Sequence, residues 1–267
     1  GIKVEKSPKW LIDRLIMVGQ KSVNNIVDIS NYIMLETGQP THIFDYNKIN
    51  GDSISIRRAK KGETLIGLDE KKYNLDTESL IISDFKSPIA LAGILGGQET
   101  SINNNTDEIF IESAFFNPVT IRKSSKNNQI STDASKRFER GTDPLICRKI
   151  FYKIIELIQE NCGGELITDI IESGEQLYKD KLIKLKYSKL ELVLGLKVEK
   201  KVVLNILVRL GFSIIKSDKS VNCIAPSFRP DILREIDIIE EIARMIGYDS
   251  IISDENYYGT YNYIILK

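Results

Sequence analysis

The sequence predicts two domains, a larger one of the mixed α/β class and a smaller one of the α+β class. In residues 1–172, helical patterns flank a series of short strand-like runs. Residues 182–256 instead read as a strand, two helices, a hairpin and a last helix. The polar, charge-dense stretch 173–181 separates the two patterns, and we expect it to be a linker. A chain of 267 residues is long enough to bury both cores.

The first domain is expected to open with two helices. Ser7-Pro8 is typical of an N-cap followed by a first helical position, and Gly19 ends this helix. A second helix should run over 24–35 and end at Gly38, after which residues 39–45 are extended. Six short strands should follow, at 54–59, 64–68, 73–75, 80–83, 91–98 and 109–116, with Asp69-Glu70 as the hairpin turn between the second and third.

The remaining segments complete both domains. Residues 122–141 form a polar, partly basic segment, after which Asp143-Pro144 should open a helix that runs through Ile158. The second domain should contain a strand at 182–187, helices at 188–194 and 197–210, hairpin strands at 212–216 and 221–225, and a last helix at 232–246. Residues 257–267 resemble the start of a further domain, and an initial Gly in place of Met indicates a piece of a longer protein.

Composition limits the function. The chain has 37 basic and 37 acidic residues, so neutralising phosphate in bulk is not its main role, although a local basic patch is compatible with this balance. No apolar run approaches the ~20 residues of a membrane helix. Cys147, Cys162 and Cys223 lack metal-binding spacing and fit reduced thiols in the cytoplasm. With His42 as the single histidine, any mechanism that needs two imidazoles is excluded.

The strongest candidate for a small pocket is the glycine-interrupted run Leu91–Gln98 together with Glu112. Gly93, Gly96 and Gly97 let the main chain turn sharply or let a ligand approach it closely. Glu112 is a lone carboxylate in an apolar strand, so it must reach water, be paired, or be held ready for a ligand. A β-bulge with a paired glutamate is the simpler alternative and, from this stretch alone, the preferred one.

Four other polar residues have chemistry suited to a site but also have structural explanations. His42 has the unperturbed pKa of a general base, although a lone histidine in extended chain is more often only hydrogen-bonded. Thr132 and Ser135 lack a second base to activate them, which favours ligand hydrogen bonding or turn formation. Asn31 falls inside a helix, where asparagine either faces water or makes a specific hydrogen bond.

Two charged clusters also have two interpretations each. The first is a set of acids in the last helix and just before it, namely Asp231, Asp237, Glu240 and Glu241. Such oxygen ligands suit Mg²⁺, but Arg234 and Arg244 interleave with them as in a surface charge ladder, which the spacing alone favours. The second cluster either holds phosphates or is a solvated face. It consists of Arg122, Lys123, Lys126, Lys136, Arg137 and Arg140.

Several motifs, in the same order along nearly the whole chain, resemble the beta subunit of bacterial phenylalanyl-tRNA synthetase. They are 25–32, 36–45, 91–97, 112–116, 132–135, 137–141 and 225–231. The resemblance covers two modules of that subunit, the B3/B4 domain up to about residue 172 and the winged-helix-like B5 domain after it. The family's tRNA-binding N-terminal, catalytic-like and anticodon-binding domains lie outside the match.

The resemblance implies an editing site that hydrolyses tyrosine wrongly esterified to phenylalanine tRNA. Glu112 would accept the hydroxyl that distinguishes tyrosine from phenylalanine, and the glycines would leave room for the substrate. Catalytic positions implied by the match are His42, Thr132 and Asn31. Substrate-binding positions are Glu112, Gly93, Ala134, Ser30 and Gly97. We expect His42 to help position a water rather than to act as the sole base.

Three positions depart from the family pattern. Ser30 stands where the family mostly has Thr, Gln129 replaces a usual Gly, and Ala92 stands where some members carry Gly. None of these changes removes the proposed hydroxyl reader.

The resemblance also implies cofactors and partners. Mg²⁺ would be held by Asp231, Asp237, Glu240 and Glu241 at the contact with an alpha subunit. ATP would be used by the full enzyme, a heterotetramer of two alpha and two beta subunits, and not bound by this part. The substrates would be tRNA(Phe) and its tyrosyl ester. The main rival interpretation is a non-catalytic module that docks tRNA and the alpha subunit, and a third is a free-standing nucleic-acid binder.

Overall fold

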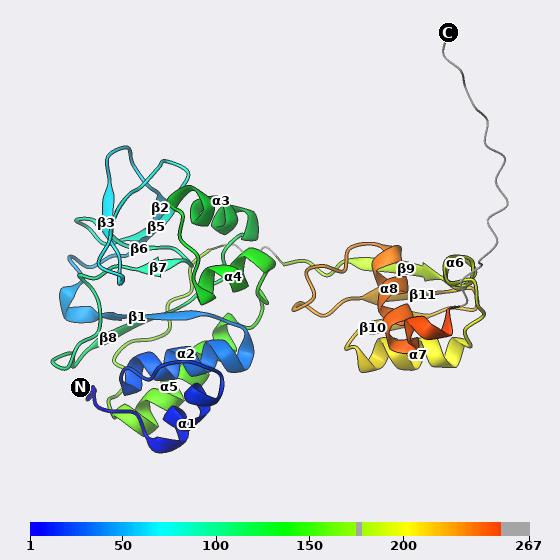
Figure 1. Ribbon diagram of the computed structural model, residues 1–267, viewed down its shortest axis with the longest axis horizontal. Coiled ribbons are helices and arrows are strands. Elements are labelled where there is room, and N and C mark those ends of the chain that lie inside the picture. The colour runs from blue at the N-terminus through cyan, green and yellow to red at the C-terminus, as the bar shows by residue number, and fades with distance from the viewer. Residues whose placement is uncertain (175–177, 252–267) are drawn as a thin grey trace, which may run out of the picture. The chain divides into compact units, whose positions relative to one another are not determined.

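The computed structural model describes residues 1–174 and 178–251, and the chain divides into two units, Gly1–Tyr178 and Lys179–Lys267 (Figure 1). The division falls inside the stretch 173–181 expected to be a linker. The expected start of a further domain at 257–267 lies outside the described residues, as do positions 252–256. Within the described part of the chain, no helix has the length and apolarity needed to cross a membrane.

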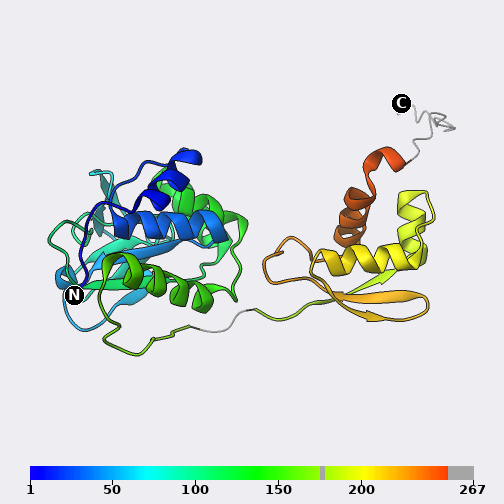
Figure 2. The same ribbon diagram turned by 90° about the horizontal axis from the view of Figure 1, so that it is seen from below.

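Three helices of unit 1 pack on one face of a two-stranded ribbon. The helices are α1 (Lys9–Met17), α2 (Asn25–Thr37) and α5 (Cys147–Cys162). The ribbon pairs β1 (Thr41–Asp45) with β8 (Ile109–Ser113) in antiparallel register. Because side chains alternate along a strand, Ile43 and Ile111 share one face of the ribbon, and both join the helix core. Figure 2 shows these three helices grouped on one side of unit 1.

The opposite face of the ribbon contributes Phe44 and Phe110 to a second core. A four-stranded antiparallel sheet forms much of this core, in the order β2 (Ser55–Arg58), β5 (Leu80–Ser83), β6 (Pro88–Leu91) and β7 (Leu95–Gly96). The hairpin of β3 (Thr64–Ile66) and β4 (Lys72–Asn74) and the helices α3 (Pro118–Asn128) and α4 (Asp133–Arg140) complete the unit. In Figure 1 the ribbon runs between the helix group and this sheet, so it separates the two cores.

Three expectations for unit 1 are corrected. Residues 91–98 are not one strand, because a turn between β6 and β7 places Gly93 in the left-handed region, at a φ of 67°. The polar segment 122–141 contains most of α3 and all of α4. The helix expected from Asp143-Pro144 begins later, at Cys147, because Asp143 instead accepts the Leu145 N–H in a preceding turn, at 3.0 Å.

The first helix also begins differently from the expectation. Pro8, not Ser7, is its N-cap, and the cap makes no side-chain hydrogen bond. The Ser7 hydroxyl instead donates to Asp28 Oδ2 on α2, at 2.5 Å. Ser7 therefore joins the start of α1 to α2.

Unit 2 is an α+β module, as predicted. Its antiparallel sheet has the order β10 (Ser213–Lys216), β11 (Ser220–Ile224) and β9 (Leu182–Lys186). The helices are α6 (Tyr187–Leu194), α7 (Lys200–Arg209) and α8 (Glu235–Ile246). They bury one core with the sheet, in which Leu185, Leu207 and Ile238 are fully enclosed. Short 3₁₀ turns lie at Tyr46–Lys48 in unit 1 and Tyr248–Ser250 in unit 2.

Candidate functional site

His42 and Glu112 lie directly opposite each other in the β1–β8 ribbon. Directly opposed residues of an antiparallel pair point to the same face, with Cβ atoms about 4.5–5.5 Å apart. That face also carries Phe44, whose ring centroid lies 4.4 Å from that of His42 at a steep angle of 74°. The strand pairing therefore brings an imidazole and a carboxyl together beside an aromatic ring.

Both side chains are recessed but retain part of their solvent exposure. Burial raises the pKa of Glu112 to about 7 and lowers the pKa of His42 to about 4. Neither side chain has a hydrogen-bond or ion-pair partner in the described part of the chain, so the paired-glutamate alternative does not hold. An unpartnered carboxyl in a recess has the properties expected of a ligand-binding acid.

At the glycines of the β6–β7 turn, other protein groups occupy the space that a side chain would take. A Cβ added at Gly96 would lie 2.3 Å from His42 Cε1, so the imidazole occupies that space. A Cβ at Gly93 would lie 2.9 Å from Phe116, and one at Gly97 would lie 2.5 Å from the main-chain oxygen of Ile89. Gly96 thus allows the turn to pack directly against His42. Room for a ligand at Gly93 and Gly97 stays a prediction.

Thr132 holds the first turn of α4 against this glycine turn. Its hydroxyl accepts the Ser135 N–H at 3.0 Å, which caps the helix, and donates to the Ile94 carbonyl at 2.8 Å. Its proton is therefore already engaged, which favours a positioning role over a nucleophilic one. Ala134 lies in the same helical turn and is partly exposed. Gln129, which ends α3, adopts the left-handed conformation that glycine favours, at a φ of 55°.

Helix α2 contacts the start of β1. The Ser30 hydroxyl donates to the Thr41 carbonyl at 3.0 Å and lies 2.9 Å from the Thr41 hydroxyl. Asn31 is partly exposed, and no described residue hydrogen-bonds its amide. Ser30 is therefore bonded to Thr41 beside His42, His42 lies opposite Glu112, and the glycine turn connects His42 to Thr132. Among the described residues, no side-chain hydrogen bond joins Asn31 to this group.

Gln39 ties the two strands of the ribbon together, a role that the sequence does not reveal. Its buried amide Nε2 donates to the carbonyls of Ala114, at 2.7 Å, and Pro40, at 3.1 Å. These bonds join the chain entering β1 to the chain leaving β8. No periodicity or spacing in the sequence marks this residue, because its role depends on a strand far away in the chain.

A pH-dependent change in stability is expected when Glu112 is replaced by glutamine. The folded-state pKa of Glu112 lies above its ordinary value of 4.5, so folding disfavours the ionised form. This cost is absent below about pH 4.5 and grows as the pH rises to about 7. Glu112→Gln should therefore raise the free energy of unfolding at pH 8 by up to about 3 kcal/mol and leave it unchanged at pH 4.

Denaturant titrations of the wild type and the variant at both pH values measure this difference. The matched control is Glu108→Gln, which changes an exposed acid just before the same strand. Equal free energies of unfolding for the wild type and Glu112→Gln at pH 8 would mean that water solvates the Glu112 carboxylate well, so that burial does not raise its pKa.

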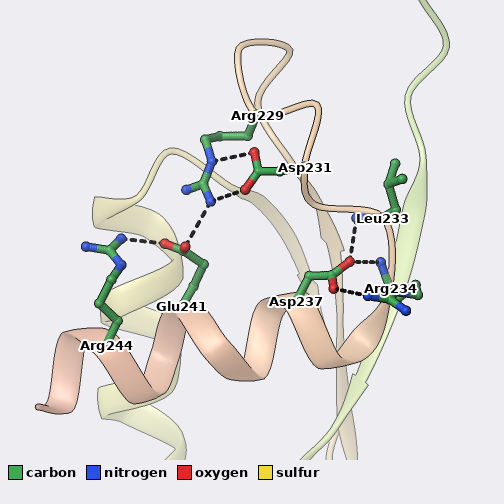
Figure 3. Close-up of polar contacts among 7 residues, drawn as sticks. All are labelled: Arg229, Asp231, Leu233, Arg234, Asp237, Glu241 and Arg244. Carbon is green, nitrogen blue, oxygen red and sulfur yellow. Dashed lines mark hydrogen bonds and ion pairs between the residues drawn. The ribbon is translucent and has the colours of Figure 1, made fainter. Parts of the chain in front are cut away.

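Three of the four acids expected to hold Mg²⁺ in unit 2, Asp231, Asp237 and Glu241, are bonded to arginines and main-chain N–H groups (Figure 3). Arg229 donates to both oxygens of Asp231, at 2.9 and 2.6 Å, and to Glu241 at 2.8 Å. Arg244 donates to the other Glu241 oxygen at 2.5 Å. Arg229 lowers the pKa of both Asp231 and Glu241.

Asp237 caps α8 rather than facing the other acids. Its Oδ2 accepts the N–H groups of Leu233, at 2.9 Å, and Arg234, at 2.8 Å, and the Arg234 guanidinium bonds Oδ1 at 3.0 Å. Glu240 is exposed. Among residues 1–174 and 178–251, no three metal-ligating side chains gather as a cation site would require. The acids as arranged do not fit Mg²⁺, and the charge-ladder interpretation describes them better.

Removing Arg229 is expected to destabilise unit 2. Arg229→Ala takes a hydrogen-bond partner from the buried Glu241 and releases Asp231, which should lower the free energy of unfolding by about 1–3 kcal/mol. The control is Arg209→Ala at an exposed position of α7. Denaturant unfolding of both variants, with and without EDTA, measures the effect. If EDTA lowered the denaturant concentration at the unfolding midpoint of the wild type, a bound metal ion would be stabilising these acids, which contradicts their pairing with arginines alone.

Comparisons with known proteins agree along both units. Residues 1–163 match the family described as B3/4 domain, and residues 183–248 match the tRNA synthetase B5 domain. The phenylalanine–tRNA ligase beta subunit of Thermotoga maritima is 40% identical over 251 residues, which are 94% of this chain and 32% of that protein. The corresponding subunit of Protochlamydia amoebophila is 40% identical over 262 residues, which are 97% of this chain and 33% of that protein.

The chain thus spans about a third of the length of these relatives. A solved N-terminal fragment of the phenylalanyl-tRNA synthetase beta subunit from Pyrococcus horikoshii aligns with 93% of this chain and 69% of that fragment, at 14% identity and a TM-score of 0.42. The B3/4 match covers more than half of the chain and contains every residue of the β1–β8 ribbon and the glycine turn. The chain belongs to the B3/4 domain family and also carries a tRNA synthetase B5 domain.

Proposed function

We propose that unit 1 is an aminoacyl-ester hydrolase that removes tyrosine from tRNA(Phe), as part of a phenylalanine–tRNA ligase beta subunit. The observation that carries this proposal is the recessed pair of His42 and Glu112, held on one face by strand register and unpartnered among the described residues. The relatives named phenylalanine–tRNA ligase beta subunit support it, because they match this chain over 94–97% of its length.

Glu112 would select the substrate by its phenolic hydroxyl. Tyrosine differs from phenylalanine by this one group, and a site that binds a hydroxyl penalises an analogue without it. As a carboxylate, Glu112 accepts a hydrogen bond, and its recessed position strengthens that bond relative to water. With a pKa of about 7, the charged form of Glu112, which accepts the stronger hydrogen bond, predominates only above neutrality, so selectivity for tyrosine should increase with pH across this range.

Hydrolysis adds a water to the ester carbonyl and returns a proton to the ribose oxygen as the carbon–oxygen bond breaks. Because the pKa of His42 is lowered to about 4, its imidazole is neutral at physiological pH and can accept a hydrogen bond from that water. The partly exposed amide of Asn31 is free to contact the substrate's polar end. Thr132 would hold the wall of the site in place through Ile94. His42 orients the water in this account and is not the sole base.

Deacylation of tRNA(Phe) carrying either tyrosine or phenylalanine tests the proposal. The chain should release tyrosine faster than phenylalanine and faster than the uncatalysed ester. Release of tyrosine at the background rate would favour the rival function, a module that docks tRNA and the alpha subunit. We assign use of ATP and Mg²⁺, and assembly with two alpha subunits and a second beta subunit, to the complete ligase.

A further inference from the structure

Helices α3 and α4 lie side by side in unit 1 (Figure 1), and together they carry several exposed cations. We define a basic face by five exposed cations, Arg122, Lys123, Lys126, Lys136 and Arg140. None of them forms an ion pair with any described residue. The whole chain has no net charge, so this concentration of unneutralised cations is local. Unpaired charge of one sign on a packed helix pair indicates an anionic partner.

A shallow hollow of about 320 Å³ lies within this face. Arg122 and Lys126 line it from α3, and the exposed Gln129 and Ser131 add neutral hydrogen-bonding groups, whereas the buried Ser125 hydroxyl donates to the Ile130 carbonyl. Glu139 lines the hollow from α4, and its main-chain oxygen accepts the Arg122 guanidinium at 2.7 Å. Cations beside serine and glutamine side chains are the groups that contact phosphate oxygens in protein–nucleic acid complexes.

Hydrogen bonds and packing contacts connect helix α4 of the basic face to the candidate site. Thr132 caps α4 and bonds the Ile94 carbonyl, in the glycine turn that also packs against His42. At 1.5 Å per residue, Lys136 and Arg140 lie about 6 and about 12 Å along the helix from Thr132. The cations of α4 therefore begin about one helical turn from Thr132, the residue that bonds the glycine turn, and continue along the helix.

We propose that the basic face binds the phosphodiester backbone of an RNA strand whose 3′ end enters the His42–Glu112 site. The inference rests on the proposed function, because an ester carried by RNA requires the preceding phosphates to lie close to the reacting end. The inference adds which surface of unit 1 holds these phosphates. The cations supply affinity that is independent of sequence, and the site supplies the selection of the amino acid.

The test compares two triple variants of the 267-residue chain with equal loss of charge. One removes cations of the basic face, as Lys126→Gln, Lys136→Gln and Arg140→Gln. The matched control removes three exposed lysines elsewhere in unit 1, as Lys61→Gln, Lys72→Gln and Lys86→Gln. Fluorescence anisotropy measures binding of a labelled tRNA(Phe) transcript between 50 and 300 mM salt, and circular dichroism confirms that both variants are folded.

The basic-face variant should bind roughly tenfold more weakly at ~0.1 M salt, and its salt dependence should be shallower by about 0.7 for each phosphate that is no longer neutralised. The control should bind like the wild type. Equal losses of affinity in both variants, or no loss in the basic-face variant, would overturn the inference, as would wild-type binding to phosphatidylserine vesicles but not to the transcript. If the basic face binds RNA and tyrosine is still not released, only the proposed hydrolysis fails.

Discussion

Replacing Glu112 by alanine should abolish the preference for the tyrosyl over the phenylalanyl ester that the proposed function requires. The variant lacks the acceptor for the phenolic hydroxyl, and a hydrogen bond to a charged group contributes about 1.5–3 kcal/mol. The ratio of the two deacylation rates should therefore fall by roughly 10- to 100-fold. Parallel deacylation assays of the two esters measure this ratio directly.

Two observations separate this result from a general loss of structure. Glu108→Ala, in the loop just before β8, should keep the wild-type ratio because its side chain is exposed. The Glu112→Ala protein should also be no less stable than the wild type at neutral pH, since it loses a recessed carboxyl that no described residue pairs with. A variant that is folded and still prefers the tyrosyl ester would rule out Glu112 as the hydroxyl reader.

Replacing Asp28 by alanine should produce a large loss of stability in unit 1. This carboxylate is fully buried and accepts three hydrogen bonds, from the hydroxyls of Ser7 and Ser22 at 2.5 Å each and from the Val23 N–H at 2.9 Å. The variant leaves all three donors without this acceptor at the junction of α1 and α2. We expect the free energy of unfolding to fall by about 3–5 kcal/mol.

Denaturant unfolding followed by circular dichroism measures this loss. Asp28→Asn keeps one acceptor oxygen and should lose less than Asp28→Ala, whereas Asp13→Ala, at an exposed position of α1, should lose under about 0.5 kcal/mol. A decrease below about 1 kcal/mol for Asp28→Ala would mean that the α1–α2 junction is held mainly by its apolar contacts.

The helices that the sequence predicted well are those with local end signals. Asn24 accepts the Val27 N–H and Gly38 adopts the left-handed conformation, so both ends of α2 were visible in the sequence. Helix α4 has eight residues and buries only Ser135 and Phe138. Helices α3 and α4 thus had no sustained apolar periodicity, and their polar composition concealed them.

The sequence indicates the individual residues of the candidate site, but it does not indicate which of them lie next to each other in space. Glu112 was conspicuous because an acid is rare inside an apolar strand, and a lone histidine attracts attention in any sequence. That the two face each other depends on the register of β1 with β8, which no local pattern encodes. The bonds of Gln39 and of Arg229 also depend on distant partners, so the sequence reveals neither role.

The two strands of the ribbon are separated by the whole of residues 46–108, which build the four-stranded sheet and the β3–β4 hairpin. Contacts between positions so far apart in a chain form late, because loop closure costs entropy before any bond compensates for it. During folding, local hairpins and helices should therefore appear first, and His42 should meet Glu112 only after the intervening sheet has closed. A partly folded chain would then have its sheet but not the opposed pair of His42 and Glu112.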